Sequence, residues 1–243
     1  MFTYPKQAEF NRPVPKTKIY AHAKPSKRVK ELFVAQVGEI LWKYKLSPET
    51  INLPPRNGIN EIQVFEIALR TPQIDPAVLN VIDKAIPFPL VFLLTHAGQV
   101  SFAASYKRPS EADTAKWVIE ACFQTVPQPM DAERPPLPVA LDLAGLYEQI
   151  VRRHIPLPAR RGEGIVDHVA RFNMLAAKMK ARQQMEARLV QEKQFNRKVE
   201  MNASVRALNE EIEGFSRVPS SRPDFRETQT GGIVGQVRQS NAR

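Results

Sequence analysis

Two glutamates on one predicted strand are the residues of this chain that come nearest to a catalytic pattern. Glu61 and Glu66 lie in an apolar run at residues 61–69. A metal-dependent nuclease holds Mg²⁺ with carboxylates on a strand, and a nearby lysine helps to polarise water. Here Gln63 stands where that lysine would help, and the glutamates differ in strand parity. We therefore predict no catalytic residue, and expect the glutamates to be edge-exposed or ion-paired, with candidate partners Lys84, Lys107 and Arg108.

Other catalytic and cofactor chemistries find less support in the residues. The histidines are scattered, without zinc-type spacing, at His22, His96, His154 and His168. Because these histidines are scattered, we expect no bound metal. No glycine-rich phosphate loop occurs, so we also expect no bound nucleotide cofactor. Cys122 is the single cysteine, which excludes an intramolecular disulfide, and its apolar neighbours predict a buried structural thiol.

Positive charge is concentrated in two segments. The net charge is +10; residues 1–30 hold eight Lys or Arg against Glu9 alone, and residues 171–198 hold eight against two acidic residues. Clustered cations favour a polyanion because they release counterions from phosphate backbones, although a solvated basic surface is the alternative. The candidate nucleic-acid-binding residues are Lys16, Lys18, Lys24, Lys27, Arg28, Lys30, Lys178, Lys180 and Arg182.

The first third of the chain is predicted to contain an arm and then a helix. Residues 1–25 are basic and proline-rich, and we expect them to lack core residues and to become ordered only on docking. Ser26 can cap a helix that starts the next segment. The apolar face of that helix is marked by three- and four-residue spacing at Leu32, Phe33, Val37, Ile40, Leu41 and Tyr44.

The middle of the chain predicts a small mixed sheet with flanking helices, an α+β fold within residues 26–160. Residues 61–69 form an interior strand, because apolar residues occupy both parities. A short helix opens at Asp75, and residues 90–94 follow as a strand. A turn at Ala97 leads into residues 100–106, and residues 117–125 favour a strand over a helix. A proline-rich connector, residues 126–160, brackets a short helix at about 142–154.

The C-terminal part predicts a long helical module over residues 161–216. Residues 164–215 lack proline, and a single helix of that length would be too long to lie on one small domain. We therefore expect a helical hairpin or a coiled coil. Its apolar stripe either binds a partner or a second copy, or packs back on the protein itself; the candidate partner-binding residues are Leu189, Phe195, Val199, Leu208 and Ile212. Residues 217–243 are predicted to be a disordered tail.

Four separated blocks of the sequence, at residues 42–52, 61–67, 82–89 and 192–200, resemble the recurring blocks of a prokaryotic family called domain of unknown function 4391. The resemblance spans about residues 5–215. Members of that family tend to be encoded beside helicases and DNA methyltransferases in restriction-like or mobile-element clusters. The resemblance therefore implies an accessory role in DNA defence, and it implies no catalytic residue.

These observations lead to one expected function and two alternatives. We expect an accessory nucleic-acid-associated factor, of a bacterial restriction-like, phage-defence or mobile-element system, that contacts DNA or RNA. Its C-terminal helix would tether a partner enzyme such as a helicase or DNA methyltransferase, or a second copy of the chain. No apolar run has the length of a membrane span or the pattern of a signal peptide, so we expect a cytoplasmic protein. The alternatives are a pure protein-interaction subunit and a divergent metal-dependent nuclease.

Overall fold

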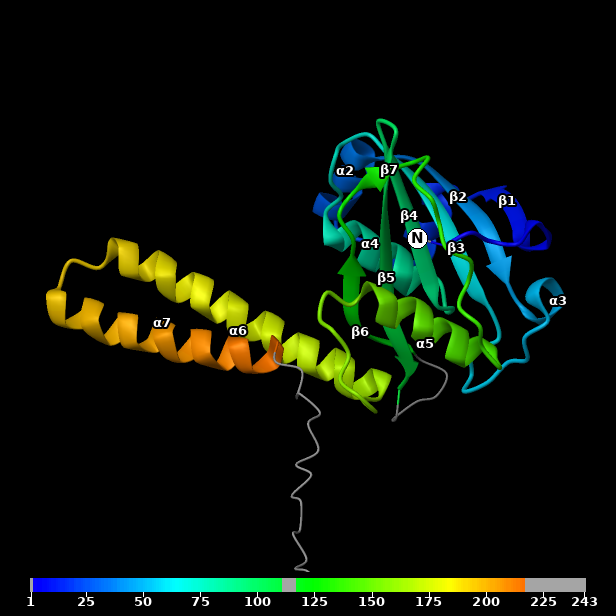
Figure 1. Cartoon of the computed structure of the whole chain (residues 1–243). Helices are drawn as coiled ribbons and strands as arrows, with labels where there is room; N and C mark the ends of the chain where they lie inside the picture. The colour runs from blue at the N-terminus through cyan, green and yellow to red at the C-terminus, as the bar shows by residue number, and fades with distance from the viewer. Residues whose placement is uncertain (1, 111–116, 217–243) are drawn as a thin grey trace, which may run out of the picture.

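The chain folds around one mixed β-sheet that carries helices on both faces (Figure 1). A computed structural model describes residues 2–110 and 117–216. In chain order the elements are η1 (Lys6–Ala8), β1 (Glu9–Pro13), α1 (Lys16–Ala23), α2 (Lys27–Gln36), β2 (Val37–Leu46), α3 (Pro48–Ile51), β3 (Ile62–Leu69), α4 (Pro76–Ala85), β4 (Leu90–His96), β5 (Gln99–Pro109), β6 (Trp117–Gln124), β7 (Gln128–Pro129), α5 (Leu143–His154), α6 (Ile165–Gln191) and α7 (Phe195–Ser216).

The strands lie side by side in the order β1-β2-β3-β4-β5-β6, and β7 pairs with the start of β5. The β3–β4 pair is parallel, with Phe65 opposite Phe92, and the other described pairs are antiparallel. A parallel pair needs a crossover connection, which α4 supplies. The predicted mixed sheet with flanking helices is therefore confirmed, including the hairpin at Ala97 and the strand β6.

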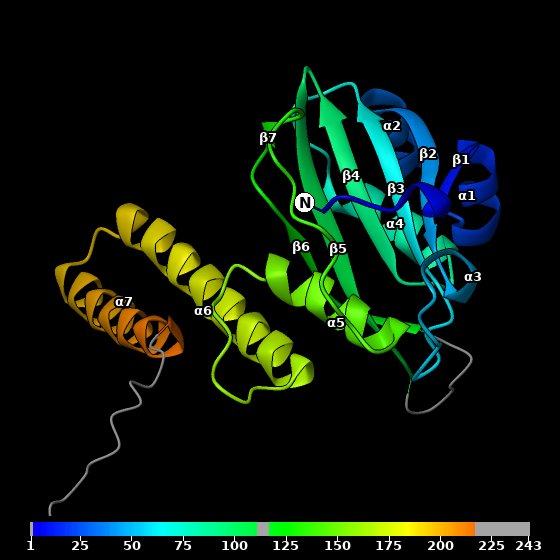
Figure 2. The same ribbon diagram turned by 45° about the vertical axis from the view of Figure 1, so that its right-hand side comes forward.

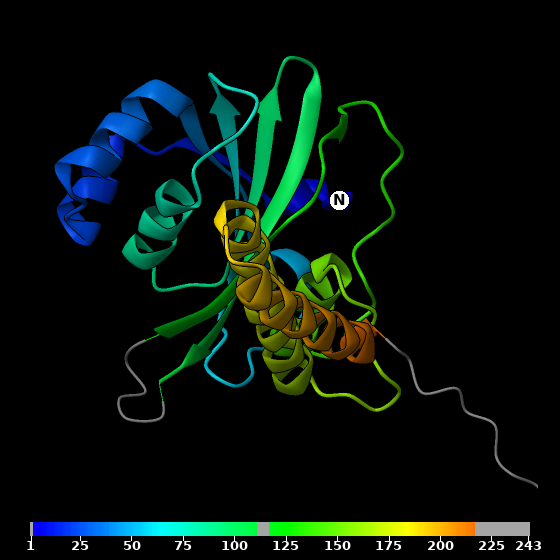
Figure 3. The same ribbon diagram turned by 90° about the vertical axis from the view of Figure 1, so that its left-hand side faces the viewer.

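Each face of the sheet is covered by its own helical layer. Helices α1, α2 and α4 cover one face, and α5 with the first turns of α6 covers the other (Figure 2 and Figure 3). Strand β3 is apolar on both parities for this reason: Val64 packs under α5, whereas Phe65 packs under α1 and α4. We call the side of the sheet that α1, α2 and α4 cover the α1–α4 face.

The helix that begins after Ser26 is shorter than its periodicity predicts. Ser26 does cap α2, since its side-chain oxygen accepts a hydrogen bond from the Val29 N–H at 3.5 Å. The prediction that the helix continues to Tyr44 was wrong, because α2 ends at Gln36 and β2 follows at once. Strand β2 pairs with β1 on one side and β3 on the other. At Gly38 a Cβ atom would lie 3.0 Å from the Ala68 carbonyl oxygen, so a side chain there would crowd the neighbouring strand.

The basic N-terminal segment is part of the fold, and the prediction that it lacks core residues was wrong. Phe2, Ala8 and Ile19 are 1%, 1% and 2% exposed. Strand β1 adds an edge to the sheet, and the Thr3 N–H donates to the Pro135 carbonyl at 2.9 Å. Most other apolar residues of this segment, such as Tyr4, Phe10, Val14 and Tyr20, are half-buried.

The proline-rich connector contributes a core helix rather than a mere link. Helix α5 begins at the predicted position, where the Asp142 carboxylate accepts a hydrogen bond from the Gly145 N–H at 2.8 Å. Its buried face includes Tyr147 and Ile150. The Tyr147 hydroxyl donates to the Ser105 carbonyl and accepts from the Lys107 N–H at 2.8 Å, which fixes α5 against β5.

The C-terminal helices form a hairpin that projects from the domain, as the sequence predicts (Figure 1). The reversal lies between Gln191 and Phe195, where the Glu192 carboxylate accepts hydrogen bonds from the N–H groups of Lys193 and Gln194 at 2.8 and 2.9 Å. Those contacts lower the pKa of Glu192. Within residues 2–110 and 117–216, no helix combines the length and the apolar character of a membrane span. The predicted disordered tail lies outside the described residues.

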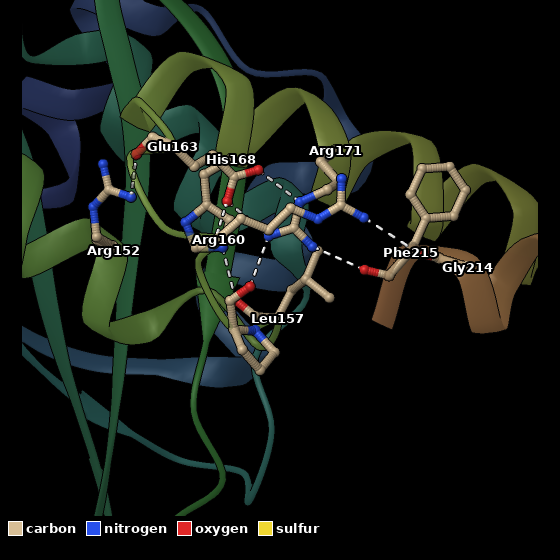
Figure 4. Close-up of polar contacts among 9 residues, drawn as sticks. Arg152, Leu157, Arg160, Glu163, His168, Arg171, Gly214 and Phe215 are labelled. Carbon is tan, nitrogen blue, oxygen red and sulfur yellow. Dashed lines mark hydrogen bonds and ion pairs between the residues drawn. The ribbon is translucent and has the colours of Figure 1, made fainter. Parts of the chain in front are cut away.

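A buried arginine holds the base of this hairpin to the domain (Figure 4). Arg171 of α6 donates to both carboxylate oxygens of Glu163, at 2.7 and 2.8 Å, and to the carbonyls of Pro158 at 2.7 Å and Phe215 at 2.9 Å. Arg160 adds a longer contact, 3.3 Å, to the Gly214 carbonyl. Because the last carbonyls of α7 have no partner within their own helix, these arginines cap α7 and fix the direction of the hairpin.

Candidate nucleic-acid interface

The predicted nucleic-acid-binding residues lie in two separate places. The first group belongs to α1, α2 and the link between them, on the α1–α4 face, whereas Lys178, Lys180 and Arg182 belong to the projecting part of α6. Helix α6 starts against the opposite face of the sheet (Figure 3). The structure therefore presents two basic groups and does not bring them together into one surface.

Lys16 has a structural position and does not belong to an exposed basic surface. Its ammonium group donates to the carbonyls of Val37 at 2.6 Å and Phe33 at 3.2 Å, which end helix α2. Burial, with a smaller contribution from the Arg70 charge, lowers the pKa of Lys16. We therefore remove Lys16 from the candidate interface.

The other predicted cations of the α1–α4 face are available to an anion. Lys18, Lys24, Lys27 and Arg28 are exposed, and within the described ranges they make no ion pair or side-chain hydrogen bond. Lys30 lies over the ring of Tyr20, with 5.7 Å from the ammonium nitrogen to the ring centroid. These positive charges are thus not neutralised by carboxylates of the fold itself.

The cations on α6 differ, because two of the three have partners inside the hairpin. Lys178 forms an ion pair with Glu211 of α7, and Arg182 lies 3.6 Å from Glu186 and donates to the Asn209 side chain at 3.3 Å. Lys180 is exposed and makes no such contact with a described residue. Because Lys178 and Arg182 already bind other residues of the hairpin, the α1–α4 face is the better candidate for a nucleic-acid interface.

A cavity of about 730 Å³ opens on the α1–α4 face. Strand β1 and helix α1 form one wall, β2 and β3 form the floor, and the loop between α4 and β4 forms the opposite wall. The lining residues are Phe10, Arg12, Pro13, Val14, Pro15, Lys18, Ile19, His22, Trp42, Gln63, Phe65, Lys84, Ala85, Ile86, Pro87 and Phe88. This set includes two lysines and an arginine but no carboxylate, and the volume is within the usual range for small-molecule sites, roughly 300–1,000 Å³.

Aromatic rings form the floor of the cavity. The centroid of the Trp42 ring lies 4.2 Å from that of Phe10, and 6.0 Å from that of Phe65 in a near-parallel arrangement of 17°. The indole N–H of Trp42 donates to the Tyr44 carbonyl at 3.0 Å, which fixes the ring. Arg12 lies over Phe10, 4.4 Å from its centroid. A fixed, half-buried aromatic floor beside cations is suited to a planar ring that carries negative charge.

Gln63 brings a buried amide to this floor. The residue is 4% exposed, and its Nε2 donates to the Glu61 carboxylate, which lies 3.3 Å from the Lys45 ammonium group. A carboxylate only accepts hydrogen bonds, so Glu61 orients the amide with its NH₂ group toward itself. The amide oxygen has no hydrogen-bond partner in the described chain. The cavity thus holds one fixed hydrogen-bond acceptor.

A buried ion pair fixes the loop that forms the opposite wall. Lys107 of β5 donates from its ammonium group to the carbonyls of Asp83 at 2.6 Å, Phe88 at 2.9 Å and Ile86 at 3.0 Å, and lies 2.8 Å from the Asp83 carboxylate. Burial raises the pKa of Asp83 and lowers that of Lys107, while the attraction between the two charges opposes both effects. Lys107 therefore ties the end of α4, which bears Lys84, and the loop that follows it to strand β5.

The two glutamates considered for catalysis are ion-paired across β2 and β3. Glu66 pairs with Lys43, and Glu61 pairs with Lys45. The expected partners Lys84, Lys107 and Arg108 were therefore wrong, because the neighbouring strand β2 carries a lysine beside each glutamate; Arg108 pairs instead with Glu120. In the described part of the chain, no three His, Cys, Asp or Glu side chains are grouped to hold a metal ion.

Cys122 is exposed, so the prediction of a buried thiol was wrong. It lies on β6 opposite Ser105 of β5. No described residue of β6 belongs to the buried cluster beneath α1, α2 and α4. The apolar neighbours that led to the prediction, such as Phe123, face the other side of the strand and pack with α5 and α6.

The predicted partner-binding stripe divides into two parts along the hairpin. Near the base, Leu208 and Ile212 are half-buried, and Ile212 packs against the core cluster of α5 and α6. Leu189, close to the tip, is also half-buried. At the tip, however, Phe195 is 77% exposed and Val199 is 53% exposed. The base therefore packs on the protein itself, and the tip presents apolar side chains to solvent.

Sequence reasoning missed most of the cavity. Phe10, Arg12, Trp42, Gln63 and Lys84 were not among the candidates, because they come from segments far apart in the chain. One local signal was incomplete: Phe10 and Arg12 are two residues apart, but the strand is irregular between them, with Asn11 at a positive φ of 48°, so regular alternation along a strand does not account for their contact. The other contributions depend on tertiary structure.

Comparison with known proteins identifies the family. The family model described as a domain of unknown function (DUF4391) matches residues 2–212. Neither a curated protein nor a solved structure matches this chain. Three of the four blocks that carry the resemblance, at residues 42–52, 61–67 and 82–89, contribute to the lining of the cavity. Because the match covers most of its length, the chain belongs to the DUF4391 family.

Proposed function

We propose that this protein is an accessory nucleic-acid-associated factor that binds DNA or RNA through the α1–α4 face and tethers a partner enzyme through the tip of its hairpin. The observation that carries the proposal is the cavity, whose lining combines aromatic rings with Arg12, Lys18 and Lys84 and includes no carboxylate. The protein would act in the cytoplasm as part of a restriction-like or phage-defence system. The partner enzyme held by the hairpin would be a helicase or a DNA methyltransferase.

The distribution of ion pairs supports a polyanionic ligand on this face. Elsewhere in the described chain many cations have acidic partners, as Lys43, Lys107 and Arg171 do. The exposed Lys18 and Lys84, by contrast, are free of acidic partners in the described ranges. Unpaired cations attract a phosphate backbone, and release of its condensed counterions supplies most of the binding free energy at low salt.

The hairpin supports the tethering part of the proposal. Its tip exposes three apolar side chains, with Val190 84% exposed in addition to Phe195 and Val199. Its base is held by the buried Arg171–Glu163 pair (Figure 4). A rigid projection with an apolar end fits a docking element, because exposed apolar patches mark interaction sites in soluble proteins.

A salt titration of DNA and RNA binding tests the proposal. Replacing Arg12, Lys18 and Lys84 together by glutamine should weaken binding to every sequence and reduce the slope of log affinity against log salt by about one for each lost phosphate contact. The matched control replaces Lys180, Lys193 and Lys198 of the hairpin by glutamine, which removes the same charge from the other basic group. Fluorescence anisotropy with labelled oligonucleotides measures both.

The two variants give a clear decision. The proposal requires that the cavity variant loses affinity and that the hairpin variant binds like the unchanged protein. Equal losses in both variants would show that only the total charge matters, and failure of the unchanged protein to bind any oligonucleotide at low salt would leave the protein-interaction alternative. Cleavage of the probes with added Mg²⁺ would instead favour the nuclease alternative.

A further inference from the structure

We propose that the cavity on the α1–α4 face binds one unpaired nucleotide of a nucleic-acid strand, with its base against Trp42 and its phosphates beside Lys18 and Lys84. This inference rests on the proposed function, since it names the form of nucleic acid that the same face recognises. Three features of the cavity support it independently: the fixed aromatic floor, the free amide oxygen of Gln63 and the cations at its rim.

The aromatic floor selects for a flat, exposed ring. Trp42 is held by its hydrogen bond to Tyr44 and by packing against Phe10 and Phe65, and its half-buried ring lines the cavity, so it offers a preorganised contact surface. In a duplex each base is already stacked on both sides, and its faces are covered. An unpaired base has a free face and can stack on an aromatic side chain, as in proteins that bind single strands.

Gln63 adds a polar contact that paired bases cannot use. Its oxygen is fixed by the Glu61 contact on the amide nitrogen, and it can only accept a hydrogen bond. Every base has an N–H group on its Watson–Crick edge, and that group is occupied in a duplex. An unpaired base can donate it to the Gln63 oxygen, which has no hydrogen-bond partner within the described chain.

Positively charged side chains lie on both sides of the aromatic floor. Lys18 on α1 and Lys84 at the end of α4 stand on opposite walls, and Arg12 lies on the β1 side over Phe10. Phosphates on either side of the bound base would therefore meet positive charge, while the base meets the aromatic floor between them. An acidic peptide would satisfy the cations but would leave the floor and Gln63 unused.

The fluorescence of Trp42 provides a direct test. The full-length Trp117→Phe protein retains Trp42 as its single tryptophan. We expect saturable quenching of that fluorescence by single-stranded oligodeoxycytidylate, by oligoadenylate RNA and, more weakly, by a free mononucleotide. A blunt-ended duplex should bind more weakly and leave the fluorescence nearly unchanged, and polyglutamate should also leave it unchanged.

Substitutions in the cavity separate stacking from charge. Trp42→Leu should weaken single-strand binding about tenfold, the size expected for one base–aromatic stack, and Trp42→Phe should restore most of it. Gln63→Leu should weaken it about threefold to tenfold, as for one hydrogen bond. Neither change should alter duplex binding. Because Trp42→Leu removes a packed ring and could impair folding, Gln63→Leu serves as the second variant, and urea unfolding checks both.

The outcomes distinguish this inference from the function on which it rests. Quenching by single strands together with a selective loss in the variants supports the inference. Equal affinity for single strand and duplex, without quenching, would overturn the inference while the proposed function stands. Quenching by polyglutamate would overturn it in favour of an acidic protein segment. Absence of binding to every nucleic acid would overturn both.

Discussion

Protonation of Glu163 should release the clamp at the base of the hairpin (Figure 4). The hydrogen bonds from Arg171 are the main cause that lowers the pKa of Glu163 from 4.5 to about 2. A factor of ten in proton affinity corresponds to about 1.4 kcal/mol, so the charged carboxylate stabilises the fold by about 3 kcal/mol. The Glu163 side chain is 8% exposed, which keeps screening by solvent small.

The sign of the pH dependence follows from the lowered pKa. The unfolded chain binds a proton at Glu163 below about pH 4.5, whereas the folded chain does not until about pH 2. The contribution is therefore complete above about pH 4.5 and is lost as the pH falls toward 2. Glu163→Gln should remove this contribution at neutral pH, because it leaves the buried Arg171 charge without its counter-ion; loss of one partner of a buried pair costs a similar amount, roughly 3–5 kcal/mol, and is the same effect rather than an additional one.

Urea unfolding of the two proteins across this pH range measures the effect. The difference in unfolding free energy should be about 3 kcal/mol near neutral pH and should shrink toward zero at acidic pH. Glu210→Gln, at an exposed position of α7, is the control and should behave like the unchanged protein. A difference that stays constant down to about pH 3 would refute the argument, because the stability would then not come from the charged form of Glu163.

Three further expectations follow from burial and packing. Phe2→Ala should destabilise the protein by about 3–5 kcal/mol, and deletion of residues 2–24 should prevent stable folding; an unchanged melting temperature would contradict the core position of this segment. Replacing Phe195 and Val199 by alanine should change the melting temperature little but abolish partner capture or self-association, as light scattering can show. Lys107→Met should cost about 3–5 kcal/mol by leaving Asp83 buried and unpaired, and adding Asp83→Asn should recover part of the loss in urea unfolding.

Local chemistry predicted the starts of elements better than their ends. Ser26 and Asp75 each accept a hydrogen bond from the first turn of the helix that they cap, and both contacts were foreseeable from residue type. The end of α2 was not foreseeable, because the spacing from Leu32 to Tyr44 suits a helix. Val37 and Ile40 nevertheless belong to a strand, since β1 and β3 offer it partners on both sides.

The candidate site was less predictable than the fold, because its polar contacts join distant segments. Charge clustering included Lys18, which lines the cavity, but it also included Lys16, whose ammonium group binds the carbonyls at the end of a helix of the same domain. Nothing near Lys107 in the sequence indicates that it binds three carbonyls of a loop about 20 residues away. Such contacts depend on which strands become neighbours, and single-sequence patterns do not contain that information.

Under the proposed function, the hairpin would act as a spacer of set length, because Arg171 and Glu163 hold its base to the domain. Helix α6 has 27 residues, so at 1.5 Å per residue it extends about 40 Å. Arg171 binds the Phe215 carbonyl of α7 at one end of the hairpin, and the exposed Phe195 lies at the other end. An enzyme held at the tip would therefore work at a constant distance from the strand held on the domain. The length of this hairpin, rather than any base contact, would then decide which stretch of nucleic acid the enzyme reaches.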